Sequence, residues 1–231
     1  MLNDMNWFID NLENNIPFGF ARFNDGEMGG IAEVGTIAAR GDQRVDETLS
    51  VALKDALTHK QKNYYIGIPC SLCYPAYNQL ALQLVGEYKY LTKAVVTTNR
   101  NWKKFIDLFP NAIKGKRVLW VGGDDQEVDE LEKININIVK KGLIPRTNSW
   151  RYFEHIRKTF PNNFQSGDIV GISLGPTARV LVKEWFASMP DITFIDMGSN
   201  LDPYTRNIRH NCHKGWEDTG FNLTTPCAEC N

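Results

Sequence analysis

Asp25 and Glu27 are the two residues whose types and spacing point most directly to chemistry. They are separated by Gly26 and follow residues 18–23, an apolar and aromatic run that is typical of a strand. Two carboxylates at this spacing offer oxygen ligands to a hard divalent cation and leave room for phosphate oxygens. A solvated turn is the alternative, because Asp-Gly is a common turn sequence. Arg22 is a further candidate for contact with a phosphate.

Two glycine-containing segments also follow predicted strands and could receive a ligand. Residues 173–178, Ser-Leu-Gly-Pro-Thr-Ala, join an apolar strand to a helix. Gly175 allows close approach to the backbone, and the helix start after it would attract a phosphate. The alternative is a tight strand-helix turn without a ligand. Gly122 and Gly123 form a weaker candidate, since neither a dinucleotide-binding fingerprint nor a P-loop lysine accompanies them.

Five cysteines form two Cys-x-x-Cys pairs, Cys70 with Cys73 and Cys227 with Cys230, and leave one cysteine over. An odd number of cysteines without a secretory signal argues against a disulfide framework. Together the two pairs predict a structural Zn²⁺ site that ties the C-terminal segment to the first pair. Buried, inert thiols are the alternative. Three other residues are alternative zinc ligands: His210, Cys212 and His213.

The overall composition is that of an ordinary globular protein. Of the 231 residues, 42% are hydrophobic and 23% are charged, and the formal net charge is -1. This charge excludes a global basic field of the kind that binds nucleic acid. No apolar run approaches the roughly 18 residues of a membrane span, and the first residues lack the pattern of a secretory signal. We therefore expect a cytoplasmic enzyme with no transmembrane segment and no nucleic-acid partner.

Strands and helices alternate along the chain. Predicted strands cover residues 18–23, 64–68, 94–98, 117–121, 134–139, 168–174 and 192–197. Predicted helices cover residues 4–14, 45–60, 75–88, 99–109, 125–133, 150–160 and 177–189. Such alternation predicts an α/β, Rossmann-like fold with a mostly parallel sheet and helices on both faces. Ligands of these folds bind beyond the carboxyl ends of the strands, where the segments at Asp25, Gly122 and Gly175 all fall.

Four of these segments together resemble the GT-D glycosyltransferases. Residues 20–27, Phe-Ala-Arg-Phe-Asn-Asp-Gly-Glu, resemble the Arg-Phe-Gly-Asp-Gly-Glu start of that family. Residues 41–49 are similar to its stretch before the first long helix, and residues 174–181 to its Gly-Pro-Thr-Ala segment. Residues 195–198, Ile-Asp-Met-Gly, resemble its Ile-Asp-Ile-Gly strand end. The segments occur in the same order and extend over about residues 17–205, so the combination is more specific than any one of them.

The resemblance implies a Rossmann-like glycosyltransferase domain of GT-D type. It implies transfer of a sugar from a nucleotide-sugar donor, commonly a UDP sugar, to an acceptor hydroxyl. We expect residues 1–231 to form this single domain, with a Cys/His-rich tail at about residues 206–231 that lies outside the resembling segments. We expect the acceptor to be a glycan or a glycoprotein.

The resemblance also implies roles for individual residues. It assigns Asp25 and Glu27 to a Mn²⁺ or Mg²⁺ ion and to the donor diphosphate. It makes Gly175 and Thr177 candidates for contact with the donor. Asn24 departs from the family pattern, because it stands where the family has glycine, but both carboxylates are kept.

No motif specifies the base that would activate the acceptor. In an inverting transferase, a general base deprotonates the acceptor hydroxyl as it attacks the anomeric carbon. Asp202 is the first candidate and Asp196 the second, because both follow a strand end that faces the predicted cleft. The alternative to an enzyme is a non-catalytic module that binds a nucleotide sugar within a polysaccharide assembly system.

Overall fold

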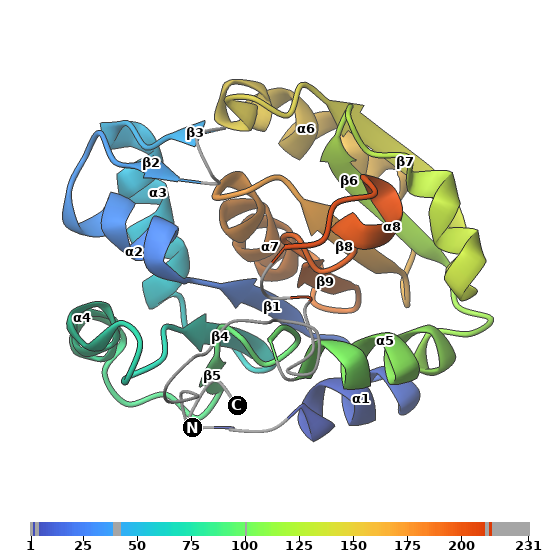
Figure 1. The fold of residues 1–231 in the computed structure, drawn as a ribbon, viewed down its shortest axis with the longest axis horizontal. Coiled ribbons are helices and arrows are strands. Elements are labelled where there is room, and N and C mark those ends of the chain that lie inside the picture. Colours follow the sequence, from blue (N-terminus) through green and yellow to red (C-terminus); the bar gives the residue numbers. More distant parts are fainter. Residues whose placement is uncertain (1, 3–4, 39–42, 100, 211–212, 214–231) are drawn as a thin grey trace.

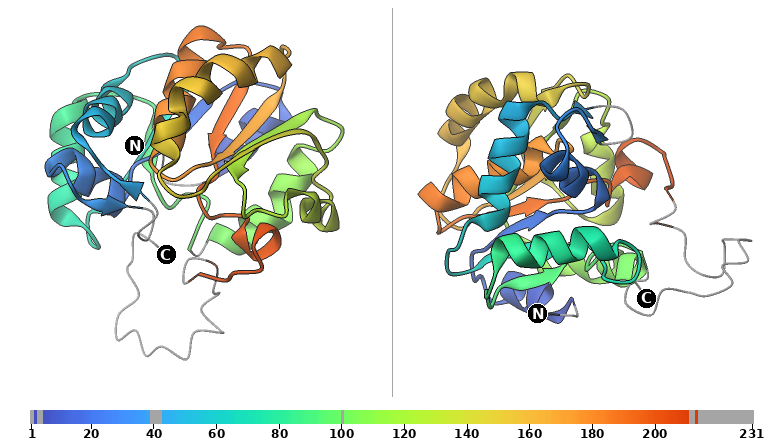
Figure 2. Two further views of the ribbon diagram at one scale, coloured as in Figure 1. Left: turned by 90° about the horizontal axis from the view of Figure 1, so that it is seen from above. Right: turned by 90° about the vertical axis from the view of Figure 1, so that its left-hand side faces the viewer.

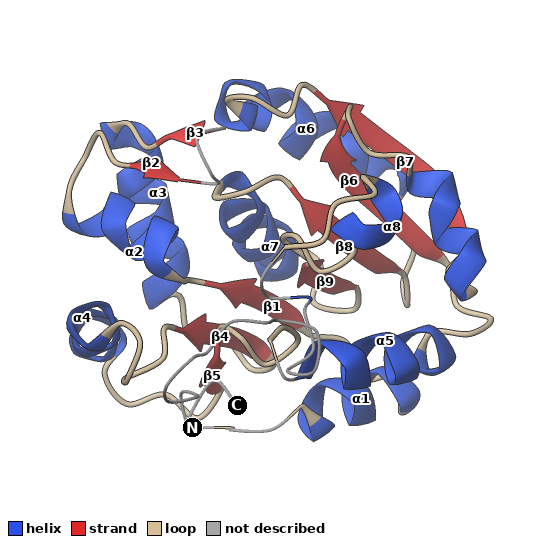
Figure 3. Ribbon diagram, in the orientation of Figure 1, coloured by secondary structure: helices blue, strands red, loops and turns tan. Residues whose placement is uncertain are grey.

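One parallel sheet forms the centre of the fold (Figures 1 and 3). The computed structural model describes residues 2, 5–38, 43–99, 101–210 and 213. Within these residues, seven strands pair in the order β5-β4-β1-β9-β8-β6-β7, and every pairing in this sheet is parallel. The strands are β1 (Gly19–Arg22), β4 (Tyr64–Ile68), β5 (Leu91–Lys93), β6 (Val118–Gly123), β7 (Ile138–Ile144), β8 (Ile169–Ser173) and β9 (Thr193–Asp196). The predicted α/β architecture is confirmed.

Helices cover both faces of this sheet (Figure 2). Successive residues of β6 pack on opposite faces of the sheet, so both faces need a cover. Leu119 and Val121 belong to one buried cluster, and Trp120 belongs to the other. Helices α1 (Asn6–Glu13) and α5 (Asn101–Ala112) contribute to the Trp120 cluster. Five helices contribute to the other cluster: α2 (Asp25–Ala32), α3 (Glu47–Thr58), α4 (Pro75–Val85), α6 (Phe153–Thr159) and α7 (Thr177–Ser188). A strand buried on both faces has no polar alternation, which explains the continuous apolar runs.

Shorter elements connect this framework. A small antiparallel pair is formed by β2 (Ile37–Ala38) and β3 (Gln43–Arg44). The 3-10 helices are η2 (Val128–Ile134), η3 (Ser149–Tyr152) and η4 (Phe160–Asn163), and the short helix α8 (Asp202–Thr205) follows β9. Among the residues described, no helix has the length and apolar character needed to cross a lipid bilayer.

Three differences from the sequence prediction concern the pocket or the edge of the sheet. Asp25 begins helix α2, which the Asp-Gly pattern does not predict. Residues 94–98 form turns rather than a strand. Val96 is apolar because it packs in the core, and the strand at this edge of the sheet, β5, ends just before this segment. Strand β7 begins four residues later than predicted, at Ile138. The first two differences both change the wall of the pocket described below.

Asp46 caps the start of α3. Its Oδ1 accepts hydrogen bonds from the amide of Leu49 at 2.9 Å and from the hydroxyl of Thr48 at 2.7 Å. Burial raises the pKa of Asp46, but these hydrogen bonds lower it by more, so that the pKa lies below its ordinary value. Because the pKa is lowered in the folded state, the cap stabilises the fold above the ordinary carboxyl range and loses this effect as the pH falls.

Replacing Asp46 with alanine is expected to lower the free energy of unfolding by about 1 kcal/mol at neutral pH. The difference from the wild-type protein should shrink well below pH 3.8, the ordinary pKa of this side chain. Urea denaturation at both pH values measures it. Asp10→Ala, at an exposed position in α1, is the matched control and should change stability by less than about 0.5 kcal/mol. Equal losses in the two variants would contradict the capping role.

Candidate functional site

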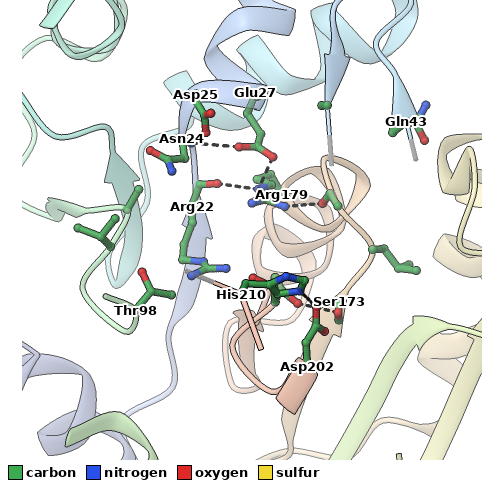
Figure 4. A pocket seen from close by; sticks show the side chains of 18 of the residues that line it. Arg22, Asn24, Asp25, Glu27, Gln43, Thr98, Ser173, Arg179, Asp202 and His210 are labelled. Atoms are coloured by element: carbon green, nitrogen blue, oxygen red, sulfur yellow. Dashed lines mark hydrogen bonds and ion pairs between the residues drawn. The ribbon is translucent and has the colours of Figure 1, made fainter. Parts of the chain in front are cut away.

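A cavity of about 700 Å³ lies at the carboxyl ends of the parallel strands. Arg22 ends β1, Gly123 ends β6 and Ser173 ends β8, and all three line the cavity. The start of α2 and the segment after β9 form further parts of its wall (Figure 4). Loops that follow parallel strands converge at this edge of a sheet, which is why ligands of such folds bind here. The predicted position of the site is therefore also the position of a cavity.

The first turn of α2 places the two predicted metal ligands in the wall of this pocket. Asp25 is exposed, and its Oδ2 lies 3.5 Å from the hydroxyl of Tyr74. Glu27 is buried, with one carboxylate oxygen 3.0 Å from the amide of Asn24 and the other 3.3 Å from the Arg179 guanidinium. Figure 4 shows Glu27 directed toward Arg179, while Asp25 lies away from it. The two carboxylates thus share the pocket but have different partners.

Arg179 is the centre of a buried network that the sequence analysis does not predict. It belongs to α7 and is 6% exposed. Its Nε donates to the carbonyl of Arg22 at 2.6 Å and lies 2.9 Å from a carboxylate oxygen of Asp196. Its other nitrogens reach Glu27 and a carbonyl in the turn before α7. A charged residue inside the apolar run of residues 178–182 is the sequence signal that could have indicated this role.

Asp196 lies beneath the pocket and supports it. The side chain is fully buried, pairs with Arg179, and accepts hydrogen bonds from the amides of Arg22 at 3.1 Å and Gly198 at 3.0 Å. An acceptor hydroxyl cannot reach a carboxylate that is enclosed in this way. The prediction of Asp196 as the second candidate base is therefore corrected: its burial at the strand end makes it a structural residue.

Arg22 remains in a position to contact a ligand. It lines the pocket although it is mostly buried, and its guanidinium donates to the side chain of Asn200 at 3.0 Å. Asn200 in turn donates to Thr97 at 2.8 Å, and its carbonyl accepts from the indole of Trp102. These contacts hold the Arg22 side chain in one orientation at the centre of the sheet edge.

Three glycines and one threonine were predicted to contact a donor. Two of these four residues line the pocket. Gly123 and Gly175 lie in its wall, Gly175 with a φ of 53°. Gly122 does not line the pocket. A buried glutamine side chain fills the space beside this glycine, where a Cβ would otherwise lie. Thr177 is fully buried, and its hydroxyl lies 2.9 Å from that of Ser149. The structure thus corrects the predictions for Gly122 and Thr177, which serve packing.

The start of α7 is not open to a phosphate in the way the sequence suggests. The amide of Ala178 donates to the carbonyl of Gly175 at 3.0 Å, and the amide of Arg179 donates to that of Pro176 at 3.2 Å. A phosphate would need these same donors. The start of α2 also lies in the pocket wall, and there the amide of Asn24 donates to the Glu27 carboxylate.

Asp202 lies in a cluster of charged side chains on another wall of the pocket. Its Oδ2 is 2.8 Å from Nε2 of His210, and its Oδ1 accepts a hydrogen bond from Arg206. Arg206 also contacts Asp125 at 2.7 and 3.0 Å, and Arg146 contacts the same carboxylate at 2.9 Å. Burial raises the pKa of Asp125, but the hydrogen bonds and charges of the two arginines lower it by more, so the net shift is downward.

His210 is the member of this cluster that the sequence analysis places elsewhere, among the alternative zinc ligands. Helix α8 and the segment after it bring His210 back against Asp202. The amide of His210 also donates to Nδ1 of His213 at 3.1 Å, and the ring of His213 packs on Trp102. No motif described above links Asp202 with His210, so only the fold reveals the pair.

The first cysteine pair lies in the pocket, and the second lies outside the described residues. Cys70 is buried, Cys73 is exposed, and the amide of Cys73 lies 3.4 Å from the Cys70 sulfur. Both line the cavity. Among the described residues, no three His, Cys, Asp or Glu side chains are grouped as a metal site. Because Cys212, Cys227 and Cys230 lie outside the described residues, the structural zinc site stays a prediction.

Comparison with known proteins gives matches in structure but not in sequence. No protein-family model and no curated protein matches the chain. One solved structure, described as showing that "the highly conserved domain of unknown function 1792 has a distinct glycosyltransferase fold", is 16% identical; the match covers 85% of this chain and 78% of that one, with a TM-score of 0.64. Another, "a new glycosyltransferase (DUF1792) from Streptococcus sanguinis", is also 16% identical, with 85% and 80% covered and a TM-score of 0.67. The chain has this glycosyltransferase fold.

The glycosyltransferase fold agrees with the resemblance found in the short sequence motifs. Those motifs extend over most of the chain, and the structural matches cover 85% of it. The predicted resemblance is therefore confirmed for the architecture. At 16% identity the shared property is the fold. What individual residues do in this chain follows from their own contacts.

Proposed function

We propose that this chain is a metal-dependent glycosyltransferase that moves a sugar from a nucleotide-sugar donor, a UDP sugar in the first place, to a hydroxyl of a glycan or glycoprotein. The observation that carries the proposal is the position of Asp25. It is an exposed carboxylate at a helix start, in the pocket of a chain with a glycosyltransferase fold.

The residues at the start of α2 fit a divalent cation that shares its ligands with a diphosphate. Mg²⁺ is usually held by one or two carboxylates together with substrate phosphates, so few protein ligands are needed. Asp25 offers exposed oxygens, and Glu27 lies in the same wall. Each carboxylate oxygen has two lone pairs, so Glu27 can keep its contacts to Asn24 and Arg179 and still be the second ligand. A bound Mn²⁺ or Mg²⁺ would neutralise charge on the departing diphosphate.

The donor diphosphate has suitable surroundings at the same wall. The amides and dipole of a helix start favour phosphate, and α2 begins in the pocket. Arg22 presents a guanidinium from the end of β1, and Gly175 lets a ligand approach the backbone. We assign the donor to the sheet edge between these residues.

We further propose that transfer inverts the anomeric configuration. In a single displacement, the acceptor hydroxyl attacks opposite the leaving diphosphate, and a base near the hydroxyl takes its proton. Figure 4 shows Asp202 and His210 on the far side of the pocket from Asp25. A proton acceptor on this side would be separated from Asp25, the proposed metal ligand, as a single displacement requires.

The test is a screen for release of free nucleoside diphosphate from UDP-glucose, UDP-galactose, UDP-N-acetylglucosamine and GDP-mannose. Water and p-nitrophenyl glycosides serve as acceptors, with Mn²⁺ or with EDTA. We expect at least one donor to be consumed with Mn²⁺, and EDTA to abolish the release, since a cation is expected to lower the barrier by several kcal/mol.

Two results would contradict the proposal. Binding of UDP to the full chain without release from any donor would favour the non-catalytic binding module. Release that persists unchanged in EDTA would remove the metal from the mechanism. Analysis of the glycoside product by NMR decides between inversion and retention, since the two outcomes differ in anomeric configuration.

A further inference from the structure

We propose that one side of the pocket binds the nucleobase of the donor, and that Thr98 and Asn99 form hydrogen bonds with the edge of this base. The inference rests on the proposed glycosyltransferase function, because it assigns part of the same site. It starts from two polar side chains that line the pocket. Among the residues that the structure describes, neither side chain has a hydrogen-bond partner.

The two sides of the pocket belong to different parts of the sheet. Strands β4 and β5 lie on one side of β1, whereas β9, β8 and β6 lie on the other. Thr98 and Asn99 follow β5, and Asp202 follows β9. Figure 4 accordingly shows Thr98 and Asp202 on opposite sides of Arg22. Five residues without an ionisable side chain form part of the wall on the β5 side, here called the neutral lobe: Asn24, Ala94, Val95, Thr98 and Asn99.

Backbone hydrogen bonds fix the segment that carries Thr98 and Asn99. The amide of Thr98 donates to the carbonyl of Val95 at 3.1 Å, and its carbonyl accepts from the amide of Asn101 at 3.1 Å. The carbonyl of Asn99 accepts from the amide of Trp102 at 3.0 Å. These bonds use main-chain groups only. Thr98 is just 6% exposed, and an unpaired polar group in such a place costs free energy, so a ligand in the pocket would supply the missing partner.

The neutral lobe adjoins the place assigned to the donor diphosphate. Asn200 donates to the hydroxyl of Thr97 at 2.8 Å and accepts from the guanidinium of Arg22 at 3.0 Å. On the other border, Asn24 directly precedes Asp25 at the start of α2. The lobe thus touches both groups proposed to surround the diphosphate, and a part of the donor bonded to the diphosphate can reach it.

The order of groups in a nucleotide sugar decides which part lies in the neutral lobe. The diphosphate joins the nucleoside to the sugar, so these two parts extend from it in different directions. The sugar must meet the acceptor hydroxyl and a group that takes its proton. Asp202, the first candidate base, lies across the pocket from the neutral lobe. The nucleoside is therefore the part that the neutral lobe receives.

The chemistry of the neutral lobe suits a nucleobase. A base is uncharged, has an apolar face and presents hydrogen-bond donors and acceptors along its edge. The hydroxyl of Thr98 and the carboxamide of Asn99 can each donate and accept, so they match both kinds of group. Ala94 and Val95 add apolar surface to the same lobe. In uracil, the edge that these side chains bind is N3–H with a carbonyl on either side.

The experiment measures the binding of UDP, 3-methyl-UDP and inorganic pyrophosphate to the full chain by calorimetry with Mg²⁺. The methyl group blocks N3–H, and pyrophosphate lacks the base altogether. We expect the wild type to bind UDP more tightly than either of the others. Thr98→Val and Asn99→Gly should each weaken UDP binding about 2–10-fold, the effect of one neutral hydrogen bond, and leave pyrophosphate binding unchanged.

Matched variants separate recognition from structure. Thr98→Ser keeps the hydroxyl and should bind UDP within about twofold of the wild type. Asn99 has a φ of 54°, which glycine adopts readily, so Asn99→Gly removes the carboxamide without straining the backbone. Asn135→Gly is its control, because Asn135 has a φ of 60° and is exposed outside the pocket. It should bind all three ligands as the wild type does.

Three results would overturn the assignment of the neutral lobe. They are UDP binding that Thr98→Val and Asn99→Gly leave unchanged, equal losses for UDP and pyrophosphate, and wild-type binding of 3-methyl-UDP as tight as that of UDP. The donor screen tests the transferase separately. If no donor releases nucleoside diphosphate but both variants weaken UDP binding selectively, the transferase proposal fails and the lobe still binds the base. If donors are consumed and UDP binding is unaffected, the assignment of the lobe alone is wrong.

Discussion

Asp25→Ala is expected to lower Mn²⁺-dependent turnover about 10²–10³-fold, because a cation contributes several kcal/mol to stabilising the leaving diphosphate. The side chain is exposed, and its one contact described above is the 3.5 Å approach of the Tyr74 hydroxyl. Its removal should therefore leave the free energy of unfolding within about 0.5 kcal/mol of the wild type. Loss of activity without loss of stability is the signature of a group that acts on the ligand.

Asp25→Asn sharpens this test. The amide keeps the size of the side chain and one oxygen, but it lacks the charge that binds a cation. We expect the Mn²⁺ concentration for half-maximal turnover to rise, and turnover to recover in part at high Mn²⁺. Asp10→Ala, outside the pocket, should behave as the wild type. Full activity of Asp25→Ala at every Mn²⁺ concentration would show that the cation is held elsewhere or is not used.

Arg179→Met is expected to lower the free energy of unfolding by about 3–5 kcal/mol, the usual cost of removing one partner from a buried ion pair. Its guanidinium contacts two carboxylates, Glu27 and the fully buried Asp196. Methionine fills a similar volume but leaves both charges without their main cation. Because proteins of this size are stable by only about 5–15 kcal/mol, urea denaturation should show a large shift of the midpoint.

Two further variants test the explanation. Arg179→Lys keeps the charge but cannot span several acceptors, so its loss should be intermediate. Arg157→Met removes a surface arginine that pairs with the exposed Glu154, and it should cost at most about 1 kcal/mol. If Arg179→Met were as mild as Arg157→Met, the buried network would not be what holds the start of α2 against the sheet.

The central strands could be predicted from the sequence, and the edge strands could not. Strands β4, β6 and β8 are buried along their whole length, so their apolar runs are continuous and unambiguous. At the two edges of the sheet, β5 has only three residues and β7 is mostly exposed. Three residues are too few to give β5 a clear pattern, and burial places little constraint on the composition of β7, so the boundaries predicted there were wrong.

Helix α2 could not be predicted, although it carries Asp25. Its sequence contains three glycines in eight residues, which disfavour a helix by local propensity. Tertiary contacts outweigh that cost. Gly30 lies directly against Val45, where a Cβ would come within 2.8 Å of that side chain, and Glu27 is fixed by Arg179. Gly30 therefore allows close packing, and that packing is visible only in the folded chain.

The sequence alone determined the alternation of strands and helices, and with it the sheet edge at which Asp25, Gly123 and Gly175 meet. This prediction succeeds because hydrophobic periodicity and the connection rules for parallel strands depend on the local sequence and on the order of the elements along the chain. Only the tertiary structure decided which charged groups are partners. Asp196 is enclosed by Arg179, while Asp202 is joined to His210 in the pocket. Such pairing depends on burial and on distances in space, and neither can be read from the local sequence.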